Sequence, residues 1–138
     1  MKKKTFGDDV LLVDVIAFYG TREEAQNFID GLKIDYKLGG VGYCGVLPDN
    51  GGFVVWVQDS NDFYCLLHEC VHLITYIFDS KGINTDLHNE DETFAYFMSF
   101  WFKNLWRFFG NINKNEKDGY KHSVQRVRKA TKKEPREK

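Results

Sequence analysis

Two histidines and a glutamate occur at a spacing that can bind and use a metal ion. His68, Glu69 and His72 match the pattern His-Glu-x-x-His. In an α-helix, residues four apart lie on the same face one turn apart, so both imidazoles can bind one Zn²⁺ ion. Glu69 is offset by about 100° around the helix axis, so it is not a third ligand from that face, but it can reach a water molecule on the metal. The spacing therefore predicts His68 and His72 as metal ligands and Glu69 as a general base.

A catalytic zinc site usually has three protein ligands, so a third must come from elsewhere in the chain. The metzincin pattern needs a glycine at position 75 and a histidine at position 78. This sequence has Thr75 and Phe78 there, so the metzincin class is excluded. Cys65 lies on the face of the histidines, but about 10.5 Å of helix rise separates it from His72. We therefore interpret Cys65 as a packing residue.

The acidic segment 86–92 holds the candidates for the third ligand. Glu92 shares a helix face with the least bulky residues that follow it, which would let it lie close to the motif helix, so we predict it as the ligand. Glu90 and His88 are the alternatives. A purely structural interpretation is that these acids complement the dipole of a helix whose N-cap is Asn89.

Local patterns predict the elements that position the motif. Residues 10–18 are rich in β-branched and large apolar side chains, which is typical of a buried strand. Thr21 and Glu24 form a capping-box pattern in front of a predicted helix at 22–32. A hairpin is predicted at 46–57, because its central Asn-Gly and Gly-Gly pairs supply the positive φ angles of a chain reversal.

The motif lies in a predicted helix at 63–78, behind a run of capping residues at 59–62. A polar loop and an aromatic helix at 90–109 follow, and the aromatic content predicts that this helix is buried on most sides. The fold class is therefore α+β: strand, helix, β-hairpin, motif helix, aromatic helix carrying the third ligand, and a basic tail. The aromatic side chains of residues 100–109 exceed what a small domain can cover, which suggests a homodimer or partner interface there.

Composition limits the remaining possibilities. The chain has 138 residues, of which 43% are hydrophobic and 16% aromatic, so one folded domain is expected rather than a disordered chain. No apolar run is long enough to span a membrane, and the basic start of the chain is not followed by a signal-peptide pattern. Cys44, Cys65 and Cys70 form no Cys-x-x-Cys pair and are predicted to be buried thiols in a reducing compartment, so we expect a cytoplasmic protein.

Charge divides the chain into two parts. Residues 1–113 contain nine Lys and Arg against sixteen Asp and Glu, whereas 114–138 contain ten against four. We predict a single acidic domain over 1–113 and a flexible basic tail over 114–138. The tail is an alternative nucleic-acid-binding segment through counterion release, but its only aromatic residue is Tyr120, and the acidic domain opposes binding.

The sequence resembles the short zincin-type metallopeptidases encoded by bacteriophages and other mobile elements. The resemblance covers roughly residues 40–105, through the 53–57 strand, the motif, and Asn89-Glu90-Asp91-Glu92 before Phe94. It implies a minimal zincin fold of α+β class, with Zn²⁺ held by His68, His72 and an acidic residue of the 90–92 group, and Glu69 as general base. The chain is also similar, more distantly, to the ImmA/IrrE type of zincin, which would favour Glu90 as the ligand.

The expected function is zinc-dependent peptide hydrolysis on a peptide or protein substrate, in the host cytoplasm if the chain is phage-encoded. The metal would activate water, and Glu69 would accept its proton and pass it to the leaving amine. Tyr96, Tyr43 and His88 are candidate oxyanion donors. The 53–57 strand is either interior or an edge that binds an extended peptide. The alternative function is a catalytically inactive zincin-like module that binds a host or phage protein.

Overall fold

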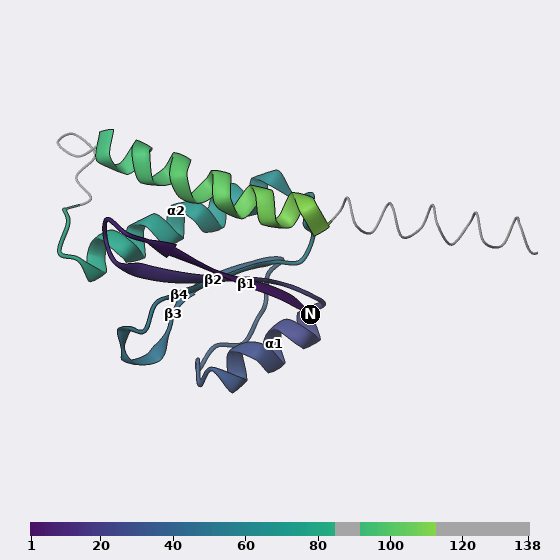
Figure 1. Cartoon of the computed structure of the whole chain (residues 1–138). Helices are drawn as coiled ribbons and strands as arrows, with labels where there is room; N and C mark the ends of the chain where they lie inside the picture. Colours follow the sequence, from purple (N-terminus) through teal and green to yellow (C-terminus); the bar gives the residue numbers. More distant parts are fainter. Residues whose placement is uncertain (85–91, 113–138) are drawn as a thin grey trace, which may run out of the picture.

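The computed structural model describes residues 1–84 and 92–112, which form four strands and three helices (Figure 1). In chain order the labelled elements are β1 (Lys2–Asp8), β2 (Val13–Tyr19), α1 (Arg22–Gly31), β3 (Gly42–Val46), the short 3₁₀ turn η1 (Pro48–Asn50), β4 (Phe53–Val57) and α2 (Phe63–Ser80). Residues 92–112 form a further helix, here called the third helix. His88, Glu90 and the predicted tail lie outside the described residues.

The strands form one mixed sheet in the order β1-β2-β4-β3. β1 and β2 are antiparallel, β2 and β4 are parallel, and β4 and β3 form an antiparallel hairpin. All five residues of β4 are buried, as expected for an interior strand with both faces covered. The 53–57 strand is therefore interior, and β1 and β3 occupy the two edges of the described sheet.

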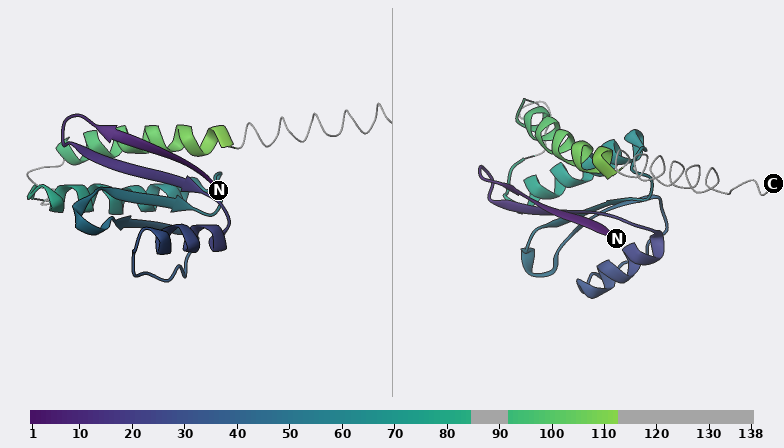
Figure 2. Two further views of the ribbon diagram at one scale, coloured as in Figure 1. Left: turned by 60° about the horizontal axis from the view of Figure 1, so that its bottom comes forward. Right: turned by 45° about the vertical axis from the view of Figure 1, so that its right-hand side comes forward.

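Helices cover both faces of the sheet, which gives three layers (Figures 1 and 2). α1 packs on one face, where Ala25 and Ile29 join a cluster with Phe18, Val54 and Trp56. α2 and the third helix lie side by side on the other face. α2 contacts β3 and β4, so it lies over the half of the sheet that ends in the edge strand β3.

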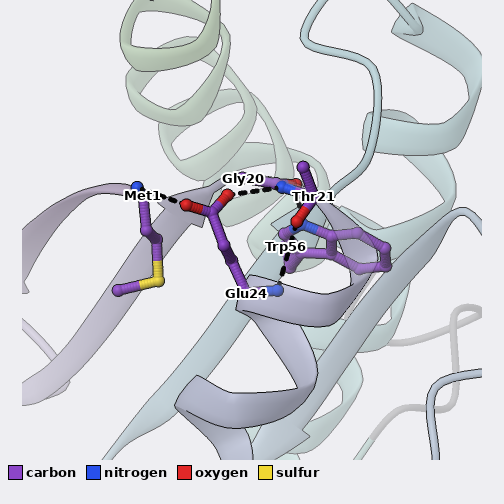
Figure 3. A network of polar contacts seen from close by, with 5 residues as sticks. All are labelled: Met1, Gly20, Thr21, Glu24 and Trp56. Atoms are coloured by element: carbon purple, nitrogen blue, oxygen red, sulfur yellow. Dashed lines mark hydrogen bonds and ion pairs between the residues drawn. The ribbon is translucent and has the colours of Figure 1, made fainter.

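The start of α1 is fixed by the capping box that the sequence predicts (Figure 3). The Glu24 amide donates to Thr21 Oγ1 (3.2 Å), and the Thr21 amide donates to Glu24 Oε2 (2.8 Å). The Met1 ammonium group donates to the other carboxylate oxygen of Glu24 (3.0 Å), and the Trp56 indole donates to the Gly20 carbonyl (3.1 Å). This network ties the helix to both β1 and β4.

The third helix packs antiparallel to α2. Phe78, near the end of α2, meets Phe94 and Phe97, whereas Phe63, at its start, meets Phe102 and Trp106. The side chains that the third helix buries recur at intervals of three or four residues and lie on one face: Phe97, Trp101, Leu105, Phe109 and Ile112. The predicted homodimer through this helix stays a prediction. Among the large apolar side chains of residues 100–109, Trp106 is the most exposed, at 37%.

Most local predictions are confirmed, and one strand was missed. The helix at Arg22, the motif helix and the α+β class are confirmed. The hairpin is confirmed too, but its first strand covers 42–46, and the positive φ angles of its turn belong to Asp49 and Gly52 rather than to the Asn-Gly pair. The predicted strand at 10–18 begins later, at Val13, because residues 9–12 form a turn in which Leu12 has a φ of 55°. The prediction omitted β1, whose lysines and threonine give no apolar alternation.

Among the described residues, no helix has both the length and the apolar character needed to cross a bilayer.

Candidate metal centre

The motif residues lie in the middle of α2, on the side that faces the edge strand β3. Asp62 caps the helix, since its Oδ1 accepts a hydrogen bond from the Cys65 amide (2.9 Å). The apolar side of α2, including Leu66, Leu73 and Ile77, is buried against the sheet. His68 and His72 are exposed on the other side of the helix.

The two imidazoles lie within hydrogen-bonding distance of each other on the exposed side of α2. The Nε2 atoms of His68 and His72 are 3.1 Å apart, with ring centroids separated by 4.7 Å and ring planes at 80°. Two nitrogens bound at about 2 Å to a tetrahedral Zn²⁺ ion are held about 3.3 Å apart. The observed separation therefore fits a shared zinc ion with little movement of either side chain.

Glu69 is buried beside this pair, with only 7% of its surface exposed. Its carboxylate packs against the backbone of β3 at Gly42, where a Cβ atom would lie 2.6 Å from Glu69 Oε1 and 2.6 Å from Cys65 Sγ. Glycine at this position therefore leaves room for the carboxylate. Burial raises the pKa of Glu69, and the nearby His68 opposes part of this rise, so the carboxylate has a higher affinity for a proton than an exposed one.

A groove of about 840 Å³ brings these side chains together. One wall is the edge strand and the segment before it, and the other is the exposed side of α2. The groove contains His68, Glu69 and His72, and it is lined further by Tyr36, residues 40–46, Asp62, Tyr64, Cys65 and Tyr76. Its size is within the range of small-ligand and peptide sites.

The edge strand directs backbone groups into this groove. Gln58 donates to the Val41 carbonyl (2.7 Å) and Leu47 donates to the Gly52 carbonyl (2.8 Å), so the odd-numbered residues of this hairpin pair with β4. Because antiparallel pairing alternates, the N–H and C=O groups of Gly42, Cys44 and Val46 point away from β4. All three residues line the groove, so they offer hydrogen-bonding positions to an extended chain.

The three cysteines surround Glu69 as protonated thiols. No disulfide joins Cys44, Cys65 and Cys70, and Cys44 and Cys70 are buried, as predicted, whereas Cys65 is half-buried. Burial, and next the Glu69 charge, raise the pKa of Cys65 to about 11 and that of Cys70 to about 12. The same two causes, in the same order, raise the pKa of Cys44 well above its ordinary value. A thiol with a raised pKa is a poor metal ligand or nucleophile, which agrees with a packing role.

Tyr76 is a groove residue that the sequence prediction did not include. Its ring stacks on His72, with ring centroids 6.1 Å apart and planes at 19°. Burial, and then the neighbouring Cys44, Glu69 and Tyr36, raise the pKa of its hydroxyl. The signal was present in the sequence, because Tyr76 continues the four-residue spacing of the two histidines on one helix face.

The predicted oxyanion donors are placed differently. The Tyr43 hydroxyl lies over Gly45 of the same strand, where it would collide with a Cβ atom, and its ring stacks on Tyr36 with centroids 4.7 Å apart. Tyr96 is 61% exposed on the third helix, outside the residues that line the groove. His88 lies outside the described residues.

The third ligand is not brought to the histidines within the described chain. Glu92 is exposed at the first described position of the third helix, which meets α2 near its C-terminal end rather than at the motif. In residues 1–84 and 92–112, no group of three His, Cys, Asp or Glu side chains is arranged to hold a metal. Glu90 lies outside these residues, so Glu92 as the ligand, with Glu90 and His88 as alternatives, stays a prediction.

Comparison with known proteins gives no relative for this chain. No family model, no curated protein and no solved structure is significantly similar to it. The resemblance to phage-encoded zincins therefore stays a prediction.

Proposed function

We propose that this protein is a zinc-dependent peptidase that hydrolyses an extended peptide bound along β3. The observation that carries the proposal is the 3.1 Å separation of the His68 and His72 Nε2 atoms, in a groove that also contains the buried carboxylate of Glu69. Zinc hydrolases use two helical histidines at this spacing together with a nearby carboxylate. We further propose that the phage-type zincins are the family to which it belongs.

The proposal gives roles to three groove residues and to one carboxylate of the 90–92 segment. His68 and His72 hold the metal, and a carboxylate of the 90–92 segment completes the site. A bound Zn²⁺ ion would lower the pKa of a water molecule and polarise the substrate carbonyl. Glu69 accepts a proton in the attack step and gives it to the leaving amine in the collapse step.

The edge strand supports a peptide substrate in particular. The outward backbone groups of Gly42, Cys44 and Val46 can pair with an extended chain, which would place one of its carbonyls across from the two histidines. Such pairing recognises the peptide backbone, so it is compatible with many side-chain sequences. We therefore expect a polypeptide rather than a small ester or sugar.

Elemental analysis of the purified protein tests the metal site. We expect about one zinc per chain in the wild type and in Glu69→Gln, and loss of zinc in His68→Ala. Glu92→Ala and Glu90→Ala form a matched pair, and the variant that loses zinc identifies the third ligand. A wild type that holds no zinc after reconstitution would contradict the proposal and favour the inactive binding module.

Digestion of a random-sequence peptide pool, followed by mass spectrometry, tests the reaction. Removal of a general base typically lowers a rate by about 10²–10⁴-fold, so we expect zinc-loaded Glu69→Gln to lose cleavage by that factor. Equal cleavage by the wild type and Glu69→Gln would show that Glu69 is not the base. Cleavage by neither would favour the binding module.

A further inference from the structure

We propose that Tyr76 is the residue that stabilises the negative charge on the substrate carbonyl oxygen during hydrolysis. The inference rests on the proposed peptidase function and adds a catalytic residue to it. Zinc hydrolases lower the barrier further when a hydrogen-bond donor is aimed at the oxygen that gains charge. Among the described side chains of the groove, the Tyr76 hydroxyl is the donor that the geometry places best.

The position of Tyr76 relative to His72 carries the inference. The two residues are one turn apart on α2, and their rings are nearly parallel, at 19°, with centroids 6.1 Å apart. Side chains on a helix lean toward its N-terminus, so the Tyr76 side chain leans toward His72 and its ring lies beside the imidazole. Tyr76 and both imidazoles line the same groove, so we infer that its hydroxyl reaches the space beside the two Nε2 atoms.

The other tyrosines of the groove are less suitable. The hydroxyl of Tyr43 lies over Gly45, and Tyr36 stacks on the Tyr43 ring, so this pair is held against the edge strand. Tyr64 is 82% exposed near the start of α2, one turn before His68, so by the same lean its side chain extends away from the histidines. Tyr76 therefore remains as the candidate donor, and the stacking of its ring on His72 supports its position.

In the reaction, Tyr76 donates a hydrogen bond and transfers no proton. The substrate carbonyl carbon becomes tetrahedral when water attacks it, and its oxygen gains a negative charge that the hydroxyl of Tyr76 can bind. When the carbonyl re-forms, the C–N bond breaks, and the amine leaves with the proton that Glu69 took from the water. A donor of this kind acts on the transition state, so its loss lowers kcat more than it raises KM.

The test is Tyr76→Phe, which keeps the stacked ring and removes only the hydroxyl. Tyr96→Phe is the matched control, since it removes the same group from a residue outside the groove. All three proteins are loaded with Co²⁺, and the binding of acetohydroxamate is measured from the change in the visible absorption band. The probe presents an anionic oxygen to the metal, as the reacting carbonyl would.

We expect equal metal content in the three proteins and acetohydroxamate binding about tenfold or more weaker in Tyr76→Phe alone, because a hydrogen bond to a charged acceptor is lost. On a random decapeptide pool, kcat should fall about 10²–10³-fold with little change in KM. Unchanged acetohydroxamate affinity in Tyr76→Phe would overturn the inference while the metal site stands. Loss of metal from Tyr76→Phe would overturn it as well, since Tyr76 would then only support His72. Failure of the wild type to bind metal would overturn the proposed function itself.

Discussion

At the scale of single residues, the site depends on a contact between Glu69 and Gly42. The carboxylate reaches the groove only because the edge strand has no side chain at this position, and Cys65 packs against the same glycine. Gly42 lies 27 positions before Glu69 in the sequence, yet it fixes the direction of the proposed general base. We infer that Gly42 is a positioning residue for Glu69.

Substitution of Gly42 by alanine tests this role. The new Cβ atom would lie 2.6 Å from both Glu69 Oε1 and Cys65 Sγ, so one side chain or the strand must move. Added volume of this kind in a packed site costs about 1–3 kcal/mol. We expect Gly42→Ala to lower the free energy of unfolding by that amount in urea titrations and to reduce peptide cleavage while zinc is retained.

Gly39→Ala is the control for this substitution. Gly39 is exposed just before the edge strand, and a Cβ atom there has no neighbour within 4 Å. A second variant, Gly42→Ala with Cys65→Ala, removes one of the two collisions and should recover part of the lost stability. If Gly42→Ala cleaves peptides as fast as Gly39→Ala, then the contact does not position Glu69.

The residues that sequence reasoning identified are those with a local signal. His68, Glu69 and His72 form a contiguous pattern on one helix, so their convergence follows from helix geometry alone. Tyr76 belongs to the same four-residue series and could have been included on that basis. Gly42 could not have been identified from the sequence. Its role depends on which strand lies beside α2, and the tertiary fold sets that arrangement.

At the scale of elements, the sequence predicts what forms locally and not how the elements pair. The capping box of α1, the glycine-rich turn of the hairpin and the apolar period of α2 each specify their own element. β1 was missed because five of its seven residues are exposed, so its sequence has no apolar alternation. Only Phe6, which is half-buried, and Asp8, which is buried, are covered. Such a strand forms because β2 provides its hydrogen-bonding partners, and its lysines suit an exposed edge.

The third helix packs against the side of α2 that is turned away from the groove. Trp101 is fully buried in the cluster that α2 shares with the sheet. Truncation of a large buried aromatic residue costs about 3–5 kcal/mol. We expect Trp101→Ala to destabilise the protein by about this amount, whereas Lys103→Ala, at an exposed position of the same helix, should change stability by less than about 0.5 kcal/mol.

Trp101→Phe separates packing from polarity at the same position. Within the described residues, the Trp101 indole nitrogen is buried and has no hydrogen-bond partner. Phenylalanine removes this unpaired group and leaves a smaller cavity than alanine does, so its cost should be well below that of Trp101→Ala. Equal losses in the two variants, measured by urea unfolding, would show that Trp101 does not stabilise the protein by packing.

At the scale of the whole molecule, α2 separates two environments. The third helix and the sheet bury its apolar side, and the groove along β3 leaves its histidines accessible. No described side chain with a positive charge lines this groove, and Asp62 and Glu69 both do. These two carboxylates would attract a divalent cation to the proposed site between the histidines, and binding there would stabilise the folded state.

This linkage predicts that zinc raises the thermal stability of the protein. A ligand that binds only the folded state at about 100 times its Kd adds about 2.7 kcal/mol, which for a domain of this size corresponds to a rise in Tm on the order of 10 °C. The rise should disappear in His68→Ala and after chelation, and it should persist in Glu69→Gln, which keeps both histidines. Mg²⁺ at the same concentration should have no such effect, because it prefers oxygen ligands to imidazole. An equal rise in Tm for the wild type and His68→Ala would mean that zinc binds elsewhere in the chain. That result would contradict the proposal that the groove is the metal centre.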